Sequence, residues 1–187
     1  WDTIQDEVWA ATGMIYHGAL ALRSERSRAT FEALIERSTA KRFFDVNLRP
    51  PYDSMNLIKR WMRGVDWLKL NIDELSSLRN EQKIDFNDSV GEVEALREEY
   101  GIRNVLLTAG KRGARIIGEV GQVACAPATT ADPFVDTVGA GDSFSAYTIH
   151  GLLSGIPIEN IVNDASQFAA KVCSMKGATT TDITFYQ

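Results

Sequence analysis

The stretch Asp136-Thr137-Val138-Gly139-Ala140-Gly141-Asp142 decides how the rest of the chain is interpreted. It lies between a loop containing Pro133 and a mostly apolar run, 144–153, so we predict a glycine-containing loop that leads into a helix. Glycine lets the backbone approach a ligand closely, and unpaired N–H groups at a helix start favour negative charge. The pattern leaves two roles for Asp142: it caps the helix, or it takes a proton from a nucleophile held beside an anion.

The whole string resembles the second signature of the PfkB/ribokinase family of sugar kinases. In that family the amides of the Gly-Ala-Gly segment form an anion hole for the transferred phosphate, and the last Asp is the base that acts on the sugar hydroxyl. The resemblance therefore implies an anion hole at Gly139, Ala140 and Gly141, and a catalytic base at Asp142. It also implies that Asp136, with neighbouring carbonyls, holds a monovalent cation, usually K+.

Composition fits one soluble α/β domain over residues 1–187. Of the 187 residues, 44% are hydrophobic and 24% charged, which is typical of a globular fold. The net charge is −5 and no basic run marks a nucleic-acid face, so we expect no nucleic-acid partner. The sequence has neither an apolar run long enough to span a bilayer nor a signal peptide, so we expect a cytoplasmic protein with no membrane partner.

The cysteines and histidines indicate packing rather than chemistry. Cys125 and Cys173 lie far apart and in no Cys-x-x-Cys frame, so we expect buried thiols rather than a disulfide. His17 and His150 have apolar neighbours and no clustered partner ligands, so we predict that both are packing residues.

The start of the chain suggests that it is the later part of a longer protein. It opens at Trp1 without a methionine, and the family resemblance covers nearly the whole chain but only the C-terminal portion of the family fold. We therefore expect the family's opening strands, its sugar-covering lid and its first signature to be absent. A homo-oligomer is a candidate state of the full-length protein.

Strand-like runs alternate with amphipathic segments, which predicts an α/β fold with a mostly parallel sheet flanked by helices. The resemblance implies a ribokinase-like fold and adds an antiparallel edge hairpin. The predicted strands are 13–18, 43–46, 67–71, 104–108, 114–118 and 122–126. The predicted helices are 24–38, 56–63, 72–78, 89–100, 140–154 and 158–174.

Polar residues cluster at the C-terminal end of the predicted strand 43–46, where Asp45, Asn47 and Arg49 alternate before two prolines. In open α/β sheets, ligands bind outside the carboxyl ends of strands. The alternative is a loop whose Asp and Asn satisfy backbone groups. The wording Asp-x-Asn-x-Arg-Pro resembles the fructokinase-like branch of the family, in which the Asp and Arg face the active site. A guanidinium there would stabilise a transferring phosphoryl group.

The next strand end carries Asn71 and Glu74, which match the family's Asn-x-x-Glu motif. The resemblance implies that Asn71 helps to bind the nucleotide and that Glu74 organises Mg2+ and phosphate, largely through water. A single carboxylate suits Mg2+, which keeps much of its hydration shell. The alternative is an ordinary helix start, where acidic residues are favoured in the first turn.

Two later segments resemble the family's nucleotide site. Thr108, Gly110 and Gly113 form a Thr-x-Gly-x-x-Gly loop that resembles the loop holding the nucleotide phosphates and ribose. It is not a Walker A loop, which needs a different glycine spacing and a following Lys-Ser/Thr. Ser166 lies on the helix that matches the family's adenine side, where relatives often carry Asn.

The resemblance implies ATP-dependent phosphorylation of a sugar hydroxyl, with a hexose such as fructose as substrate. ATP and Mg2+ are the expected cofactors, K+ is a further candidate, and the expected partners are the sugar and ATP. A 2-keto-3-deoxygluconate kinase is the nearest rival. The chain as given is alternatively a nucleotide-binding portion that is inactive without its first half. A kinase-like regulatory protein that binds sugar without transferring phosphate is a third reading, and the intact Asp142 argues against it.

Overall fold

The computed structural model describes residues 11–51, 54–81 and 83–186, which contain six strands in the order β1-β2-β3-β4-β5-β6. The pairs β1/β2, β2/β3 and β3/β4 are parallel, so the predicted mostly parallel sheet with flanking helices is confirmed. The strands are β1 Met14–Gly18, β2 Lys41–Asp45, β3 Trp67–Asn71, β4 Asn104–Thr108, β5 Ala114–Ile117 and β6 Val123–Ala126. The α-helices are α2 Glu25–Arg37, α3 Met55–Trp61, α4 Ile72–Arg79, α5 Ser89–Tyr100, α6 Ala140–Leu153 and α7 Ile158–Cys173.

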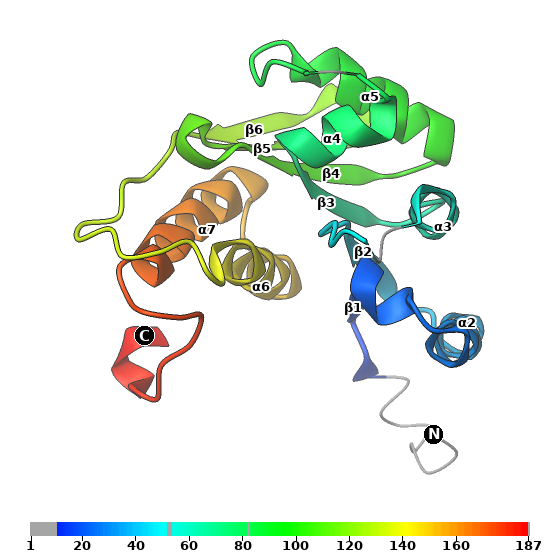
Figure 1. Ribbon diagram of the computed structural model, residues 1–187, viewed down its shortest axis with the longest axis horizontal. Helices are drawn as coiled ribbons and strands as arrows, with labels where there is room; N and C mark the ends of the chain where they lie inside the picture. The colour runs from blue at the N-terminus through cyan, green and yellow to red at the C-terminus, as the bar shows by residue number, and fades with distance from the viewer. Residues whose placement is uncertain (1–10, 52–53, 82, 187) are drawn as a thin grey trace. The chain divides into compact units, whose positions relative to one another are not determined.

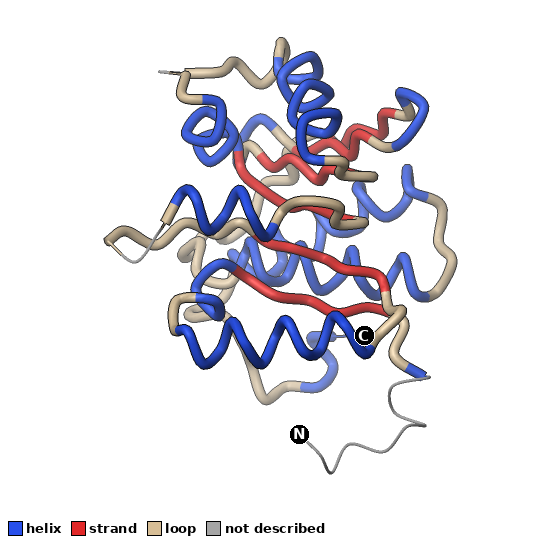
Figure 2. Tube along the Cα trace, turned by 90° about the vertical axis from the view of Figure 1, so that its right-hand side faces the viewer, coloured by secondary structure: helices blue, strands red, loops and turns tan. Residues whose placement is uncertain are grey.

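The residues group into two compact units, whose helices and strands are labelled in Figure 1. The first comprises residues 1–108 and 117–122, and the second comprises residues 109–116 and 123–187. In the first unit a helix follows each of the strands β1 to β3, an alternation that can be traced in Figure 2. In the second unit α6 packs against α7, and α7 against β6. None of the helices in the described residues is both long and apolar enough to cross a membrane.

Capping residues fix where the helices of the first unit begin and end. The Ser24 hydroxyl accepts from the Ser27 amide at 3.1 Å and starts α2, and Ser54 plays the same part for α3. The helix α4 ends at Asn80, which adopts the left-handed conformation at φ 58° that commonly terminates helices. The two serine hydroxyls accept from N–H groups that a helix start leaves unpaired, and the Asn80 backbone amide donates to carbonyls at the end of α4.

The core of the first unit is apolar and aromatic, and its strands present different side chains to the two faces. His17 and Phe44 stack at 4.6 Å between ring centroids, and His17 also contacts Phe31 of α2. Figure 1 shows α2 to α5 along this face of β1 to β4. Because side chains alternate along a strand, the neighbouring residues Tyr16 and Asp45 point to the opposite face.

The structure corrects two predictions about packing. His17 is buried, as predicted, but His150 is exposed on α6 because it lies on the helix side that faces solvent. Cys125 is likewise exposed, since outward and inward residues alternate along β6, and Cys173 is only half-buried. Both sulfurs are free thiols in the described structure.

Candidate functional site

The start of α6 forms a glycine tip with no side-chain cap. Gly139 occupies the N-cap position with φ 82°, a left-handed conformation that favours glycine. A Cβ built on Gly139 would lie 2.6 Å from the Cβ of Ala178. Glycine is therefore required twice at this position, by its backbone angle and by the close approach of the turn that follows α7.

The tip presents backbone amides and one carboxylate to solvent. The Ala140 amide donates to the Thr137 carbonyl at 3.2 Å, whereas no residue in the described ranges accepts from the amides of Gly141 or Asp142. Asp142 is exposed in the first turn, and its carboxylate makes no hydrogen bond or ion pair within the described chain. Asp142 therefore does not cap the helix, and its carboxylate lies free beside unpaired N–H groups.

Asp136 fastens the loop before the tip to the end of α7. One carboxylate oxygen accepts from the Val138 amide at 2.7 Å, and the other accepts from the Gly177 amide at 3.2 Å. The Val135 amide donates to the Cys173 carbonyl at 2.9 Å. Burial, with a smaller contribution from the Asp136 carboxylate, raises the pKa of the Cys173 thiol. Asp136 thus holds the loop before α6 against the turn that follows α7 through hydrogen bonds. Its predicted role as a ligand of a monovalent cation stays a prediction.

We expect Gly139→Ala to destabilise the protein by about 2 kcal/mol or more, because a left-handed alanine is strained and its methyl group overlaps Ala178. Urea unfolding measures the effect. The matched control is Gly155→Ala, at φ 70° with no atom within 4 Å of the added Cβ, which isolates the cost of the backbone angle. Equal losses for the two variants would contradict the close approach to Ala178.

The loop after β4 uses its glycines differently. Thr108 is half-buried at the end of β4, and Gly110 has open space around it. Gly113 has φ 95°, and a Cβ there would lie 2.3 Å from the Ala126 carbonyl oxygen. Gly113 is thus needed for close packing against the chain after β6, whereas Gly110 is the glycine whose surroundings leave room for a ligand.

Ser166 ties α7 to the segment after β6. It is buried, and its hydroxyl lies 3.3 Å from the Thr129 hydroxyl and donates to the Pro127 carbonyl at 3.3 Å. These hydrogen bonds join α7 to the segment that follows β6, within the second unit. Its predicted contact with the nucleotide stays a prediction.

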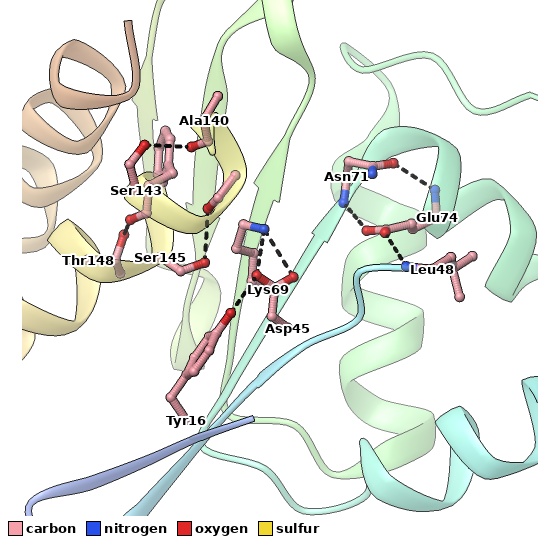
Figure 3. Close-up of polar contacts among 12 residues, drawn as sticks. Tyr16, Asp45, Leu48, Lys69, Asn71, Glu74, Ala140, Ser143, Ser145 and Thr148 are labelled. Carbon is pink, nitrogen blue, oxygen red and sulfur yellow. Dashed lines mark hydrogen bonds and ion pairs between the residues drawn. The ribbon is translucent and has the colours of Figure 1, made fainter. Parts of the chain in front are cut away.

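In the first unit, Asp45 is part of a buried ion pair. The Lys69 ammonium lies 3.0 and 2.8 Å from its two carboxylate oxygens, and the Tyr16 hydroxyl donates to it at 3.4 Å. Figure 3 shows the three side chains converging from β1, β2 and β3. The pairing follows from the strand register, which places Asp45 opposite Lys69.

Asn71 and Glu74 form a complete capping box at the start of α4 (Figure 3). The Asn71 side-chain oxygen accepts from the Asp73 and Glu74 amides, each at 2.9 Å. The Glu74 carboxylate accepts from the Asn71 amide at 2.8 Å and from the Leu48 amide at 2.9 Å. Burial raises the pKa of Glu74, and the two amide bonds oppose that shift. The helix-start interpretation therefore holds for both residues, with a second contact to the loop after β2.

Asn47 and Arg49 lie on that loop, at the carboxyl end of β2. Asn47 is half-buried with φ 38°, which is uncommon for a residue other than glycine. Arg49 is exposed, and one of its N–H groups donates to the Leu48 carbonyl at 3.3 Å. Asp45 and Asn71 thus end the neighbouring strands β2 and β3, and Asn47, Arg49 and Glu74 follow directly after them. The predicted roles of these five residues at a ligand stay predictions.

A family model described as pfkB family carbohydrate kinase matches residues 3–184 of the chain. The chain belongs to this family. Fructokinase from Klebsiella pneumoniae is 32% identical over 171 residues, which cover 86% of this chain and 52% of that protein. The chain thus spans about half the length of this pfkB-family relative.

Solved structures of pfkB-family kinases share the fold. Fructokinase from Vibrio cholerae O395, in its fructose, ADP and calcium ion bound form, superposes with a TM-score of 0.75 at 24% identity, covering 94% of this chain and 60% of that one. The 2-dehydro-3-deoxygluconokinase of Thermotoga maritima gives a TM-score of 0.80 at 15% identity, covering 94% of this chain and 59% of that one. The predicted ribokinase-like fold is therefore confirmed.

The pfkB-family motifs did not reveal one buried charge, Lys69. Its side chain is 8% exposed and the Asp45 side chain fully buried. The available sequence signal was a lysine between apolar residues of one strand, because lysine is almost never buried without a partner. The partner itself depends on the strand register.

Proposed function

We propose that the complete protein containing this chain transfers a phosphoryl group from ATP to a sugar hydroxyl, with a hexose such as fructose as the acceptor. The observation that carries the proposal is the exposed, unpaired Asp142 carboxylate beside the free amides at the start of α6. Membership of the pfkB family and the resemblance to Klebsiella pneumoniae fructokinase support it.

The tip of α6 suits phosphoryl transfer, which depends on positioning and charge stabilisation. The amides of Gly139, Ala140 and Gly141 would donate to the oxygens of the γ-phosphate, and the free Asp142 amide lies next to them in sequence. One comparable donor contributes about 2.7–4 kcal/mol in other enzymes. The sugar oxygen forms the new bond to phosphorus while the bond from phosphorus to the ADP oxygen breaks. Asp142 accepts the hydroxyl proton late, once bond formation has made that proton acidic.

The remaining site residues would bind the substrates. Arg49 and Asn47 present polar groups at the carboxyl end of β2, where a sugar or a phosphate would be held. Thr108 and Gly110 would contact the nucleotide phosphates. The exposed Gly110 can approach them closely, since it carries no side chain.

The residues present are compatible with a hydrated Mg2+. In the described ranges no group of three or more His, Cys, Asp or Glu residues is placed to hold a metal. Both oxygens of Glu74 already accept an amide, but a carboxylate oxygen can accept more than one hydrogen bond, so Glu74 would hold the ion through water. When bound, Mg2+ neutralises charge on the β- and γ-phosphates. For K+, Asp136 and the carbonyls near it are the proposed ligands.

An ADP-release assay of the complete protein tests the proposal. We expect ATP-dependent turnover with fructose that exceeds turnover with ribose, adenosine and 2-keto-3-deoxygluconate. Preferential use of 2-keto-3-deoxygluconate would replace fructose by the rival substrate and leave the reaction class intact. The absence of ADP release with every sugar would overturn the proposal.

The same assay on residues 1–187 alone tests the second candidate, a nucleotide-binding portion without its own activity. The chain spans about half the length of its fructokinase relative, so parts of the sugar site and of the water-excluding cover would come from elsewhere. We expect ATP binding by this portion without sugar-dependent ADP release. Full activity of the portion would exclude this candidate.

A further inference from the structure

The Asp45–Lys69 pair is the most deeply buried pair of opposite charges among the described ion pairs of the chain. Taking both charges out of water is unfavourable, and a pair of apolar side chains of similar volume would often serve stability as well. The pair therefore need not add to the stability of the fold. A role in fixing the position of nearby backbone explains its presence better. Tyr16 adds a hydrogen bond to the same carboxylate.

That geometric role concerns the loop that leaves β2. Asp45 is held by the Lys69 ammonium, and the next residue, Val46, donates its amide to the Lys69 carbonyl at 2.9 Å. Two residues further on, the Leu48 amide donates to Glu74 at 2.9 Å. The loop is thus fastened at three points to β3 and α4. Figure 3 draws the Asp45–Lys69 pair and the bond from the Leu48 amide to Glu74.

Asn47 lies between these anchors in a left-handed conformation. Such a conformation is strained for a residue other than glycine and persists only where the surroundings determine it. The hydrogen bonds of the Val46 and Leu48 amides, on either side of Asn47, hold its backbone in this conformation. The Asp45 side chain is fully buried, whereas Asn47 is half-buried and Arg49 is exposed, so Asn47 and Arg49 are the polar residues here that a ligand can reach from solvent.

We propose that Lys69 is a positioning residue. Through its ion pair with Asp45 it fixes the backbone of the loop 46–49, and this places the Asn47 and Arg49 side chains to contact the sugar or the phosphoryl group that the sugar receives. The inference rests on the proposed sugar-kinase function. It assigns a role to a residue that the sequence motifs do not include, and it makes Asp45 an anchor instead of a ligand.

The test variant is Lys69→Met in the complete protein. We expect the KM for the sugar to rise at least tenfold, with ATP affinity within about twofold of wild type, because the loop and not the nucleotide site is released. Lys41→Met is the matched control, since Lys41 is an exposed lysine at the start of β2. A Lys69→Met variant with the wild-type sugar KM would overturn the inference.

A double variant separates positioning from simple stability. Asp45→Asn combined with Lys69→Met removes both charges, so no unpaired charge stays buried and stability should recover. We expect the sugar KM to stay high, since the anchor is still missing. Recovery of the sugar KM together with stability would show that the pair only stabilises the fold.

Hydrogen exchange gives a readout that does not depend on activity. The Val46 and Leu48 amides should exchange at least tenfold faster in Lys69→Met than in wild type, and at the wild-type rate in Lys41→Met. If the wild-type complete protein phosphorylates no sugar, the proposed function fails while these rates still decide the positioning role. Unchanged exchange of both amides would overturn it.

Discussion

Asp142→Asn in the complete protein should lower the turnover number by roughly 10²–10⁴-fold, the usual contribution of a general base. Asparagine has almost the same shape but cannot accept the hydroxyl proton. Because the backbone amides of the tip are unchanged, ATP affinity should stay within about twofold. ADP release measures the turnover number, and calorimetric titration with ATP measures the affinity.

The matched control for this variant is Glu159→Gln. Glu159 is an exposed acid in the first turn of α7, so it shares the helix position and exposure of Asp142 without the glycine tip. We expect wild-type turnover from Glu159→Gln. Near-normal turnover by Asp142→Asn would show that Asp142 is not the catalytic base. An equal loss of turnover in both variants would indicate a general effect of surface charge.

Stability should fall as the pH is lowered from about 6.5 to about 3 because of the buried His17. Burial, with a smaller contribution from Arg42, lowers the pKa of His17 from 6.5 to about 3. Between pH 6.5 and about 3, His17 is protonated in the unfolded chain but stays neutral in the folded chain. Lowering the pH therefore favours the unfolded state. The full loss is up to about 5 kcal/mol at 1.36 kcal/mol per pKa unit.

The variant that tests this dependence is His17→Phe. Neither ring nitrogen of His17 has a hydrogen-bond partner in the described chain, so phenylalanine removes no bond and keeps the contacts with Phe31 and Phe44. Urea unfolding between pH 4 and pH 8 should show a weaker pH dependence for the variant. His150→Phe makes the same substitution at an exposed histidine and serves as the matched control. Identical slopes for wild type and His17→Phe would refute the role of His17.

Much of the fold was readable from local sequence patterns. The strands β3 and β4 and the helix α5 have the predicted bounds, because each is a periodic run with clear ends. The strand β2 begins two residues earlier than predicted and ends at Asp45. Its start is fixed by the Arg42 amide, which donates to the Asp66 carboxylate at 2.9 Å. That contact joins residues far apart in sequence, which no local pattern reveals.

The candidate site was predictable where motifs are local and was not where strands meet. The tip at Gly139 and Asp142 could be located from one string, and the capping pair Asn71 and Glu74 from their spacing. The bond between Leu48 and Glu74 and the pairing of Lys69 both require knowledge of which elements are neighbours in space. Residue chemistry alone could not supply that knowledge.

The contact between Gly139 and Ala178 links the two positions in any variant of this chain. A Cβ at position 139 would lie 2.6 Å from the Cβ of Ala178 and 2.8 Å from its Cα, so any side chain there must displace the turn that carries Ala178. The residue at the start of α6 is therefore constrained by the path of a turn nearly forty residues downstream. A library that randomises position 139 should return mostly glycine, because no other residue satisfies both the left-handed backbone angle and this close approach.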